Sequence, residues 1–152
     1  MRISRHEVQR RADQLKEACG RAGVRLTHQR MEIFREVAQT ADHPDAETVC
    51  KAVRKRLPTV SLDTVYRTLW LLRDLGLITA LGPPWGRARF DANMKQHHHF
   101  VCTRCGATRD FYSHEFDEIE VPKEAKAIGN VEATHVELRG LCMRCSRHKQ
   151  GE

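Results

Sequence analysis

The chain has 152 residues, which is enough for one ordinary domain or for two small ones. It carries 26 Lys and Arg residues against 20 Asp and Glu residues, a formal net charge of +6. This balance favours a polyanionic partner, nucleic acid first, although a merely basic soluble protein would have the same totals. No segment is apolar over a membrane's thickness and the N-terminal residues lack the apolar run of a secretory signal, so we expect a cytoplasmic protein without a membrane partner.

Four amphipathic helices are predicted in the first half of the chain. Apolar residues recur there at helical spacing, and each segment is bounded by capping or helix-breaking residues. Thr27 and Ser61 are predicted N-caps of the second and fourth helices, Pro58 ends the third, and Gly76 follows the fourth. The expected helices cover, in chain order, about residues 6–20, 28–38, 49–57 and 62–75.

A β-hairpin is predicted after the fourth helix, because apolar runs at 77–81 and 87–90 flank the Gly/Pro turn at 82–86. Helices followed by a two-stranded wing indicate a winged helix-turn-helix, with the fourth helix as the recognition helix. We therefore expect a DNA-binding domain over residues 1–86. Its candidate DNA contacts are Thr64, Tyr66, Arg67, Arg25 and Arg30, although each arginine taken singly fits a solvated basic face equally well.

The second half predicts a small α/β domain over residues 87–152, with a hinge at about 82–92, so that the fold class is α+β. Strands are expected at 97–101, 107–112 and 131–138. Residues 115–128 are weakly helical, and Pro122 makes a single unbroken helix unlikely to form there.

Two Cys-x-x-Cys pairs, Cys102/Cys105 and Cys142/Cys145, predict a structural zinc site. Each pair can present two thiolates from one tight turn, and four thiolates complete the tetrahedral shell of Zn²⁺. Because a closed site has no open position, we assign it to folding and not to catalysis. The alternative is that the thiols pair in the sequence by chance. Cys19 and Cys50 fall in helices and are expected to be buried as small apolar residues.

A histidine run, His97-His98-His99, precedes the first cysteine pair. Alternation along a strand places His97 and His99 on one face, as a shared metal requires, and directs His98 to the other, where we expect it at the surface. The alternative is two hydrogen-bonded or solvent-facing histidines. Taken alone, His43 before Pro44 would be an ordinary histidine.

The order of these motifs resembles the ferric uptake regulator family of metal-dependent repressors. The matching strings are Leu26-Thr27-His28-Gln29-Arg30, Asp42-His43-Pro44, Asp63-Thr64-Val65-Tyr66-Arg67-Thr68-Leu69, Arg89-Phe90-Asp91 and His97-His98-His99-Phe100-Val101-Cys102. The resemblance covers residues 10–146. It implies a homodimer that binds a double-stranded DNA operator and is not an enzyme. It also implies a regulatory Fe²⁺ or Mn²⁺ at the hinge, held by His43, Asp91, His97, His99 and Asp110.

Aspartate at both acidic positions, Asp91 and Asp110, resembles the peroxide-sensing branch of the family. That branch implies that peroxide oxidises His43 or His97 of the iron-bound protein. Peroxide would then be its only small-molecule substrate. Arg67 resembles the iron-sensing branch instead, so an iron- or zinc-level repressor without self-oxidation is the alternative. Two weaker alternatives are a small zinc hydrolase and a metal buffer. The hydrolase is disfavoured because the sequence has no HExxH motif. The sequence leaves open a third metal site involving Gln96, His98, Asp117 and His135.

Overall fold

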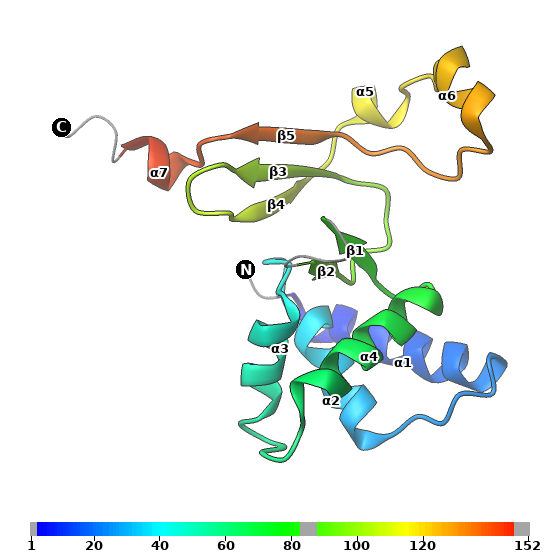
Figure 1. The fold of residues 1–152 in the computed structure, drawn as a ribbon, viewed down its shortest axis with the longest axis vertical. Helices are drawn as coiled ribbons and strands as arrows, with labels where there is room; N and C mark the ends of the chain where they lie inside the picture. Colours follow the sequence, from blue (N-terminus) through cyan, green and yellow to red (C-terminus); the bar gives the residue numbers. More distant parts are fainter. Residues whose placement is uncertain (1–2, 83–87, 148–152) are drawn as a thin grey trace. The chain divides into compact units, whose positions relative to one another are not determined.

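The computed structural model describes residues 3–82 and 88–147, so most of the predicted turn at 82–86 lies outside the described residues. The chain divides into two compact units, residues 1–94 and 95–152, and each is described by itself (Figure 1).

The four helices predicted for the first unit are all present, although the third ends at Val53 and not at Leu57 as predicted. Each begins at a side chain that accepts a hydrogen bond from a backbone N–H of the first turn, which satisfies one of the donors that a helix leaves open. Thr27 and Ser61 fill this role as predicted, and Ser4 and Asp45 cap the other two helices. The helices are α1 (Arg5–Arg21), α2 (His28–Ala38), α3 (Ala46–Val53) and α4 (Leu62–Asp74).

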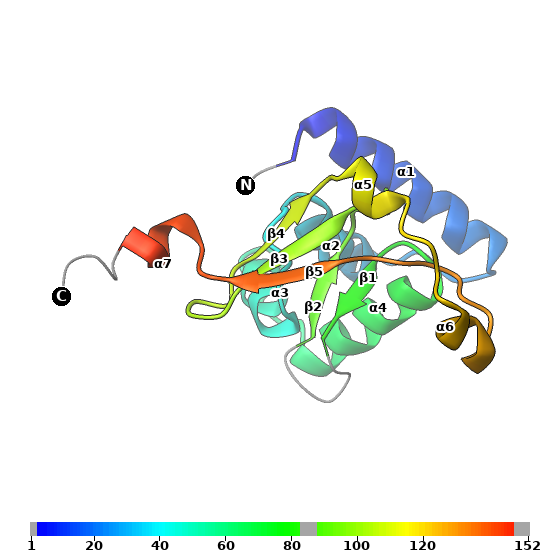
Figure 2. The ribbon, with the colours of Figure 1, turned by 90° about the horizontal axis from the view of Figure 1, so that it is seen from above.

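The core of the first unit is built from the apolar faces of these helices, and Figure 2 shows α4 running alongside the hairpin strands. Leu15, Ile33, Val53 and Leu69 are completely buried, one from each helix. After α4 the chain turns at Gly76, whose φ of 70° lies in the left-handed region that glycine adopts without strain.

A short antiparallel hairpin completes the first unit. Strands β1 (Thr79–Leu81) and β2 (Arg89–Asp91) pair with Thr79 opposite Asp91, and both are shorter than predicted. Phe90 is fully buried and packs edge-on against Trp70 of α4, with ring centroids 5.8 Å apart. The recognition-helix candidate is therefore attached to the strand that ends at Asp91.

An ionic cluster between buried Glu32 and exposed Arg56 fastens α2 to the segment after α3. Arg56 donates hydrogen bonds to Glu32 and Glu36 of α2, and these carboxylates raise the pKa of its guanidinium.

We expect Arg56→Ala to lower the free energy of unfolding by about 1 kcal/mol, because Glu32 is buried and would keep only its hydrogen bond to Arg35. Urea unfolding at neutral pH measures the effect, with exposed Lys55→Ala as the matched control. Equal stability of the two variants would contradict the assignment.

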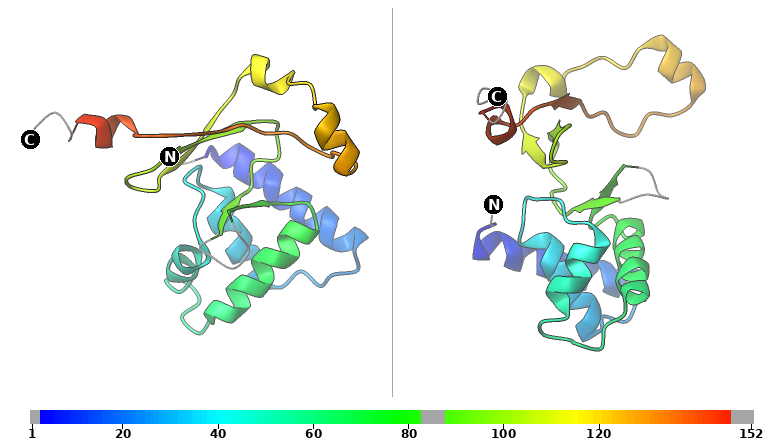
Figure 3. Two further views of the ribbon diagram at one scale, coloured as in Figure 1. Left: turned by 45° about the horizontal axis from the view of Figure 1, so that its top comes forward. Right: turned by 60° about the vertical axis from the view of Figure 1, so that its left-hand side comes forward.

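The second unit is a three-stranded sheet in the order β4-β3-β5, with β3 in the middle (Figure 2). Strand β3 (His98–Cys102) pairs antiparallel with β4 (Thr108–Phe111) and parallel with β5 (Glu137–Gly140). The crossover between β4 and β5 carries two short helices, α5 (His114–Asp117) and α6 (Lys123–Ile128), as Figure 3 shows. Helix α7 (Met143–Arg147) follows β5.

Two predictions for this unit have different outcomes. The helical stretch is interrupted at Pro122, as expected. The strand predicted at 131–138 was wrong over most of its length, because pairing with β3 begins only at Glu137, opposite His99. Just before that pair the carbonyl of Val136 accepts a hydrogen bond from the N–H of His99, and residues 131–135 form no strand.

The second unit has little apolar core of its own. Among its described residues, the buried apolar side chains are those of Cys102 and Cys145, whereas three histidines in succession, His97 to His99, are buried. The apolar cluster of the chain lies in the first unit. A unit with so little buried apolar surface depends on other stabilising interactions. Over the ranges that the structure describes, no helix has the length and hydropathy that crossing a bilayer requires.

Candidate metal centres and DNA-facing surface

The four paired cysteines converge at one end of the second unit's sheet. Cys102 ends β3 and Cys105 lies in the turn that follows it, whereas Cys142 immediately precedes α7 and Cys145 lies within it. Their sulfur atoms lie within 4.8 Å of one another, and all four cysteines are free of disulfides. Cys105 Sγ lies 3.9 Å from Cys142 Sγ. Tetrahedral zinc with bonds of about 2.3 Å separates its sulfurs by about 3.8 Å, so the donor set fits Zn²⁺.

Backbone hydrogen bonds favour ionisation of the first cysteine pair, Cys102 and Cys105. The N–H of Cys142 donates to Cys102 Sγ at 3.3 Å, and this bond, with another from Cys105, lowers the pKa of Cys102 to about 6. Burial and the neighbouring thiols raise the pKa of Cys145 to about 12. A backbone hydrogen bond with Ala107 lowers the pKa of Cys105 as well. Because zinc is ligated by thiolates, the first cysteine pair already favours the ligating form, whereas a cation would be needed to ionise Cys145.

A second set of donors converges within the second unit, next to β3. His97 Nε2 lies 2.9 Å from His99 Nε2, and Asp110 Oδ1 is 3.8 Å from each nitrogen. Cross-strand pairing explains the third member, since Asp110 lies directly opposite His99. His97 Nδ1 lies 2.6 Å from the carbonyl oxygen of Lys95, which can only accept a hydrogen bond. That contact places the proton on Nδ1 and leaves Nε2 to act as a ligand.

The first unit contributes a separate pair of donors, His43 and Asp91. His43 lies between α2 and α3, Asp91 ends β2, and both are almost completely buried. His43 Nε2 is 3.4 Å from Asp91 Oδ2. The structure thus brings the five predicted ligands together as two sets, one in each unit. Each set offers imidazole and carboxylate donors without thiolates, a chemistry that suits Fe²⁺ or Mn²⁺.

The prediction that His98 lies at the surface was wrong. Its side chain is fully buried, its Nδ1 accepts a hydrogen bond from the N–H of Val136 at 3.2 Å, and its Nε2 lies 3.1 Å from Asp117 Oδ1. Alternation does direct His98 away from His97 and His99, but α5 covers that face, and Phe116 of α5 packs against the ring. In the sequence, an aromatic residue beside an acid at Phe116-Asp117 was the only indication that a helix would cover His98.

The four residues of the possible third metal site are only partly brought together. His98 and Asp117 are adjacent, whereas the Gln96 amide donates to the carbonyl of Thr134. The His135 ring packs edge-on against His99, with centroids 6.0 Å apart.

A polar hollow of about 330 Å³ lies in the first unit between the start of α2 and the exposed side of α4. We call it the α2–α4 hollow. Arg67 is exposed and paired only with exposed Asp63 at 3.0 Å, and Arg30 donates to the carbonyl of Arg25. Tyr66 is half-buried and packs against the core. The hollow is lined by Thr27, Gln29, Arg30, Thr64, Arg67, Thr68 and Leu71.

Comparisons with known proteins agree on one family. Residues 21–140 match the model of the ferric uptake regulator family. The peroxide-responsive repressor PerR of Staphylococcus epidermidis is 33% identical over 127 residues, which is 82% of this chain and 83% of that protein. Among solved structures, the ferric uptake regulator Fur of Helicobacter pylori has a TM-score of 0.73 at 18% identity, covering 96% of this chain and 97% of that one. The peroxide stress regulator of Campylobacter jejuni has a TM-score of 0.62 at 25% identity, covering 88% and 97% respectively.

The family model covers parts of both units, and the Helicobacter pylori structure shares the α+β fold over nearly the whole chain. The family consists of transcription regulators and not of enzymes, which removes the zinc-hydrolase alternative. The chain therefore belongs to the ferric uptake regulator family of metal-dependent, DNA-binding transcriptional repressors, and it is similar to the peroxide-responsive members of that family.

Proposed function

We propose that this protein represses transcription in the metal-bound state and releases its operator when peroxide oxidises a histidine ligand. The observation that carries the proposal is the pair of thiolate-free donor sets, His43 with Asp91 and His97 with His99 and Asp110. Aspartate as the acid in both sets, and the similarity to a peroxide-responsive repressor, favour peroxide as the signal.

Division of the ligands between two units would make the metal an allosteric effector. Two donors in one unit and three in the other each leave the shell of a five- or six-coordinate ion incomplete. A metal that needs all five would bind most tightly when both sets meet, and would therefore stabilise that arrangement of the two units. In this proposal, His43 and Asp91 transmit metal occupancy to the DNA-binding unit.

The two donor sets could hold ferrous iron, which would supply the redox chemistry that splits the O–O bond of peroxide. The side chains beside it would be imidazoles and carboxylates, with no thiolate among them. We infer that one peroxide oxygen replaces a ring hydrogen of His43 or His97, as the family resemblance implies, and that the other oxygen leaves as water, with no net change in the iron. An oxidised imidazole has lost a nitrogen lone pair that ligation requires, so the shell becomes incomplete and the units are released. Manganese(II) gives an electron to peroxide far less readily and would leave the histidines intact.

DNA binding is assigned to α4 and the α2–α4 hollow. The helix starts at the Ser61 cap and exposes Arg67, while Arg30 and Thr64 line the neighbouring hollow. Arg30 can reach phosphates, and residues near the start of a recognition helix contact base edges in the major groove. Arg25 is exposed and could contact the DNA backbone, whereas Tyr66 is half-buried and packs against the core.

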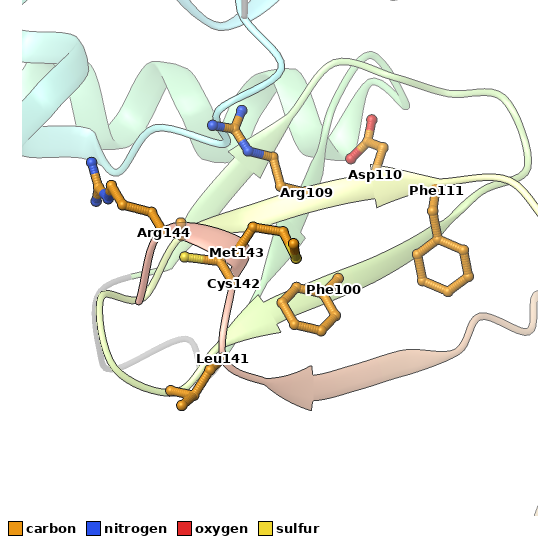
Figure 4. A pocket seen from close by; sticks show the side chains of 9 residues that line it. Phe100, Arg109, Asp110, Phe111, Leu141, Cys142, Met143 and Arg144 are labelled. Atoms are coloured by element: carbon orange, nitrogen blue, oxygen red, sulfur yellow. The ribbon is translucent and has the colours of Figure 1, made fainter. Parts of the chain in front are cut away.

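Dimer formation is assigned to the second unit. Strand β5 is at the edge of the sheet, so one side of its backbone is open to pairing, and it exposes Leu138. The same unit contains a pocket of about 610 Å³ with a largely apolar lining. Phe100, Phe111, Leu141 and Met143 are among the side chains that line it (Figure 4). Ile119, Ile128 and Val131 are also exposed. A second copy of the chain would cover surface that a unit with so little core leaves open.

An operator-binding series tests the proposed function. Affinity for an operator should require Mn²⁺ or Fe²⁺ and fall steeply as salt rises, because phosphate contacts release counterions. We expect Arg67→Ala to cost about 1–3 kcal/mol and to reduce discrimination between operators, whereas Arg30→Ala should weaken binding to all duplexes alike. Gel shifts with operator and random DNA measure both. Equal binding of the metal-loaded protein to random and operator DNA would contradict the proposal and favour a metal buffer.

The second candidate function is an iron- or zinc-level repressor that has the same ligands without self-oxidation. Arg67 favours it, because this residue on the recognition helix resembles iron-sensing members. The two candidates share metal-dependent DNA binding and differ only in whether peroxide modifies a histidine.

A further inference from the structure

His43 has an unusual backbone conformation for a metal ligand. Its φ of 49° makes it the only non-glycine residue with positive φ among residues 3–82 and 88–147. Residues other than glycine rarely occupy the left-handed region, and the residue before a proline is normally extended. Such a conformation persists only where the surroundings hold it, so the contacts around His43 determine where its imidazole points.

Strand β2 contacts both the backbone carbonyl and the imidazole ring of His43. Arg89 Nη1 donates a hydrogen bond of 3.1 Å to the carbonyl oxygen of His43, and Asp91 Oδ2 lies 3.4 Å from its Nε2. Arg89 and Asp91 are two residues apart in β2 and so share one face of the strand. The guanidinium holds the backbone of His43 while the carboxylate faces its ring.

The neighbouring residues are fastened to the same strand and to α3. Phe90 N–H donates to the carbonyl of Pro44 at 3.0 Å, and Asp45 forms an isolated bridge with Arg89. The Asp45 carboxylate also caps α3 by accepting from the N–H of Thr48 at 2.8 Å. These ties fix the chain after His43, and the Arg89 side chain adds the tie on His43 itself.

We propose that Arg89 is a positioning residue for the regulatory metal: it holds His43 in its left-handed conformation so that Nε2 stays directed at Asp91. This inference rests on the proposed function, because it assigns His43 and Asp91 to the metal. Arg89 contacts no metal itself and acts only through the carbonyl of His43.

The direction in which Arg89→Ala changes metal affinity distinguishes a positioning role from an effect of the arginine's charge. Arg89 carries a positive charge close to a site for a divalent cation. Removing that charge alone would strengthen cation binding, because two positive charges repel. Removing a group that orients a ligand should weaken binding, and loss of such outer contacts typically costs 10- to 100-fold in metal affinity. Weaker binding by Arg89→Ala therefore has no electrostatic explanation.

The test uses the zinc-loaded full chain titrated with Co²⁺, whose visible absorption bands report the number and geometry of its ligands. We expect Arg89→Ala to bind Co²⁺ about tenfold or more weakly, with altered band intensities, while zinc content and thermal unfolding match the wild type. Arg89→Lys, which keeps the charge and a donor, should recover most of the affinity. Lys55→Ala removes a charge from an exposed position of the same unit and should change nothing.

Equal or tighter Co²⁺ binding by Arg89→Ala would overturn the proposal, and so would loss of the folded first unit in its thermal melt, which would make the role purely structural. Wild type and His43→Ala report on the proposed function separately. If the wild type binds no Co²⁺ beyond the zinc site, or His43→Ala binds it equally well, the proposed function fails whatever Arg89 does.

Discussion

Cys142→Ser is expected to remove the tightly held zinc, one ion per chain, and with it the dimer. Cys142 contributes a sulfur 3.9 Å from that of Cys105 and a backbone N–H to Cys102, so both knuckles meet at this residue. Binding of structural zinc supplies about 10–16 kcal/mol in small zinc domains. Cys102 and Cys145 are also the buried apolar residues among those described in the second unit, and few other contacts could replace the lost energy.

Elemental analysis of the purified variant and its mass by light scattering measure the two effects. Cys50→Ala is the matched control, because it removes a buried thiol of the first unit and leaves the four-cysteine cluster intact. A Cys142→Ser protein that keeps one zinc per chain and remains a dimer would show that the cluster is not the structural site.

Dilute peroxide is expected to abolish operator binding by the iron-loaded protein and to spare the manganese-loaded protein. Loss of one of five ligands should remove the metal-dependent part of the affinity, about a hundredfold if the coupling is of ordinary size. Asp110→Glu, which lengthens the acid opposite His99, should retain metal-dependent binding but reduce the oxidation. Fluorescence anisotropy with labelled operator, over a range of peroxide doses, compares the iron-loaded protein, the manganese-loaded protein and the iron-loaded Asp110→Glu variant. Equal sensitivity of the iron and manganese forms would exclude iron chemistry as the trigger.

The sequence predicted well those features that depend on neighbouring residues. Thr27 and Ser61 cap their helices, Pro122 interrupts the helical stretch, and each Cys-x-x-Cys forms a knuckle, because caps, prolines and tight turns act over a few residues. Features that depend on distant segments were predicted less well. The start of β5 is set by where its pairing with β3 begins, and the burial of His98 is set by α5.

The candidate metal site shows the same division. Strand alternation alone placed His97 and His99 together, and the structure shows their nitrogens 2.9 Å apart. No local pattern could pair His43 with Asp91, which are 48 positions apart, and only the family resemblance pointed to them. The positive φ of His43 and its tie to Arg89 had no sequence signal, because both depend on β2 lying beside the His43–Asp45 segment.

Peptide mapping of the iron-loaded protein after peroxide treatment tests the central claim most directly. After metal removal and digestion, mass spectrometry should find one added oxygen atom on the peptide holding His43 or on the one holding His97. The four zinc-site cysteines should be unchanged, and the manganese-loaded protein treated in parallel should be unmodified. Unmodified histidines, together with oxidised cysteines and lost DNA binding, would contradict the account and indicate a thiol-based switch. Absence of both modification and DNA release would indicate a repressor that senses only the metal.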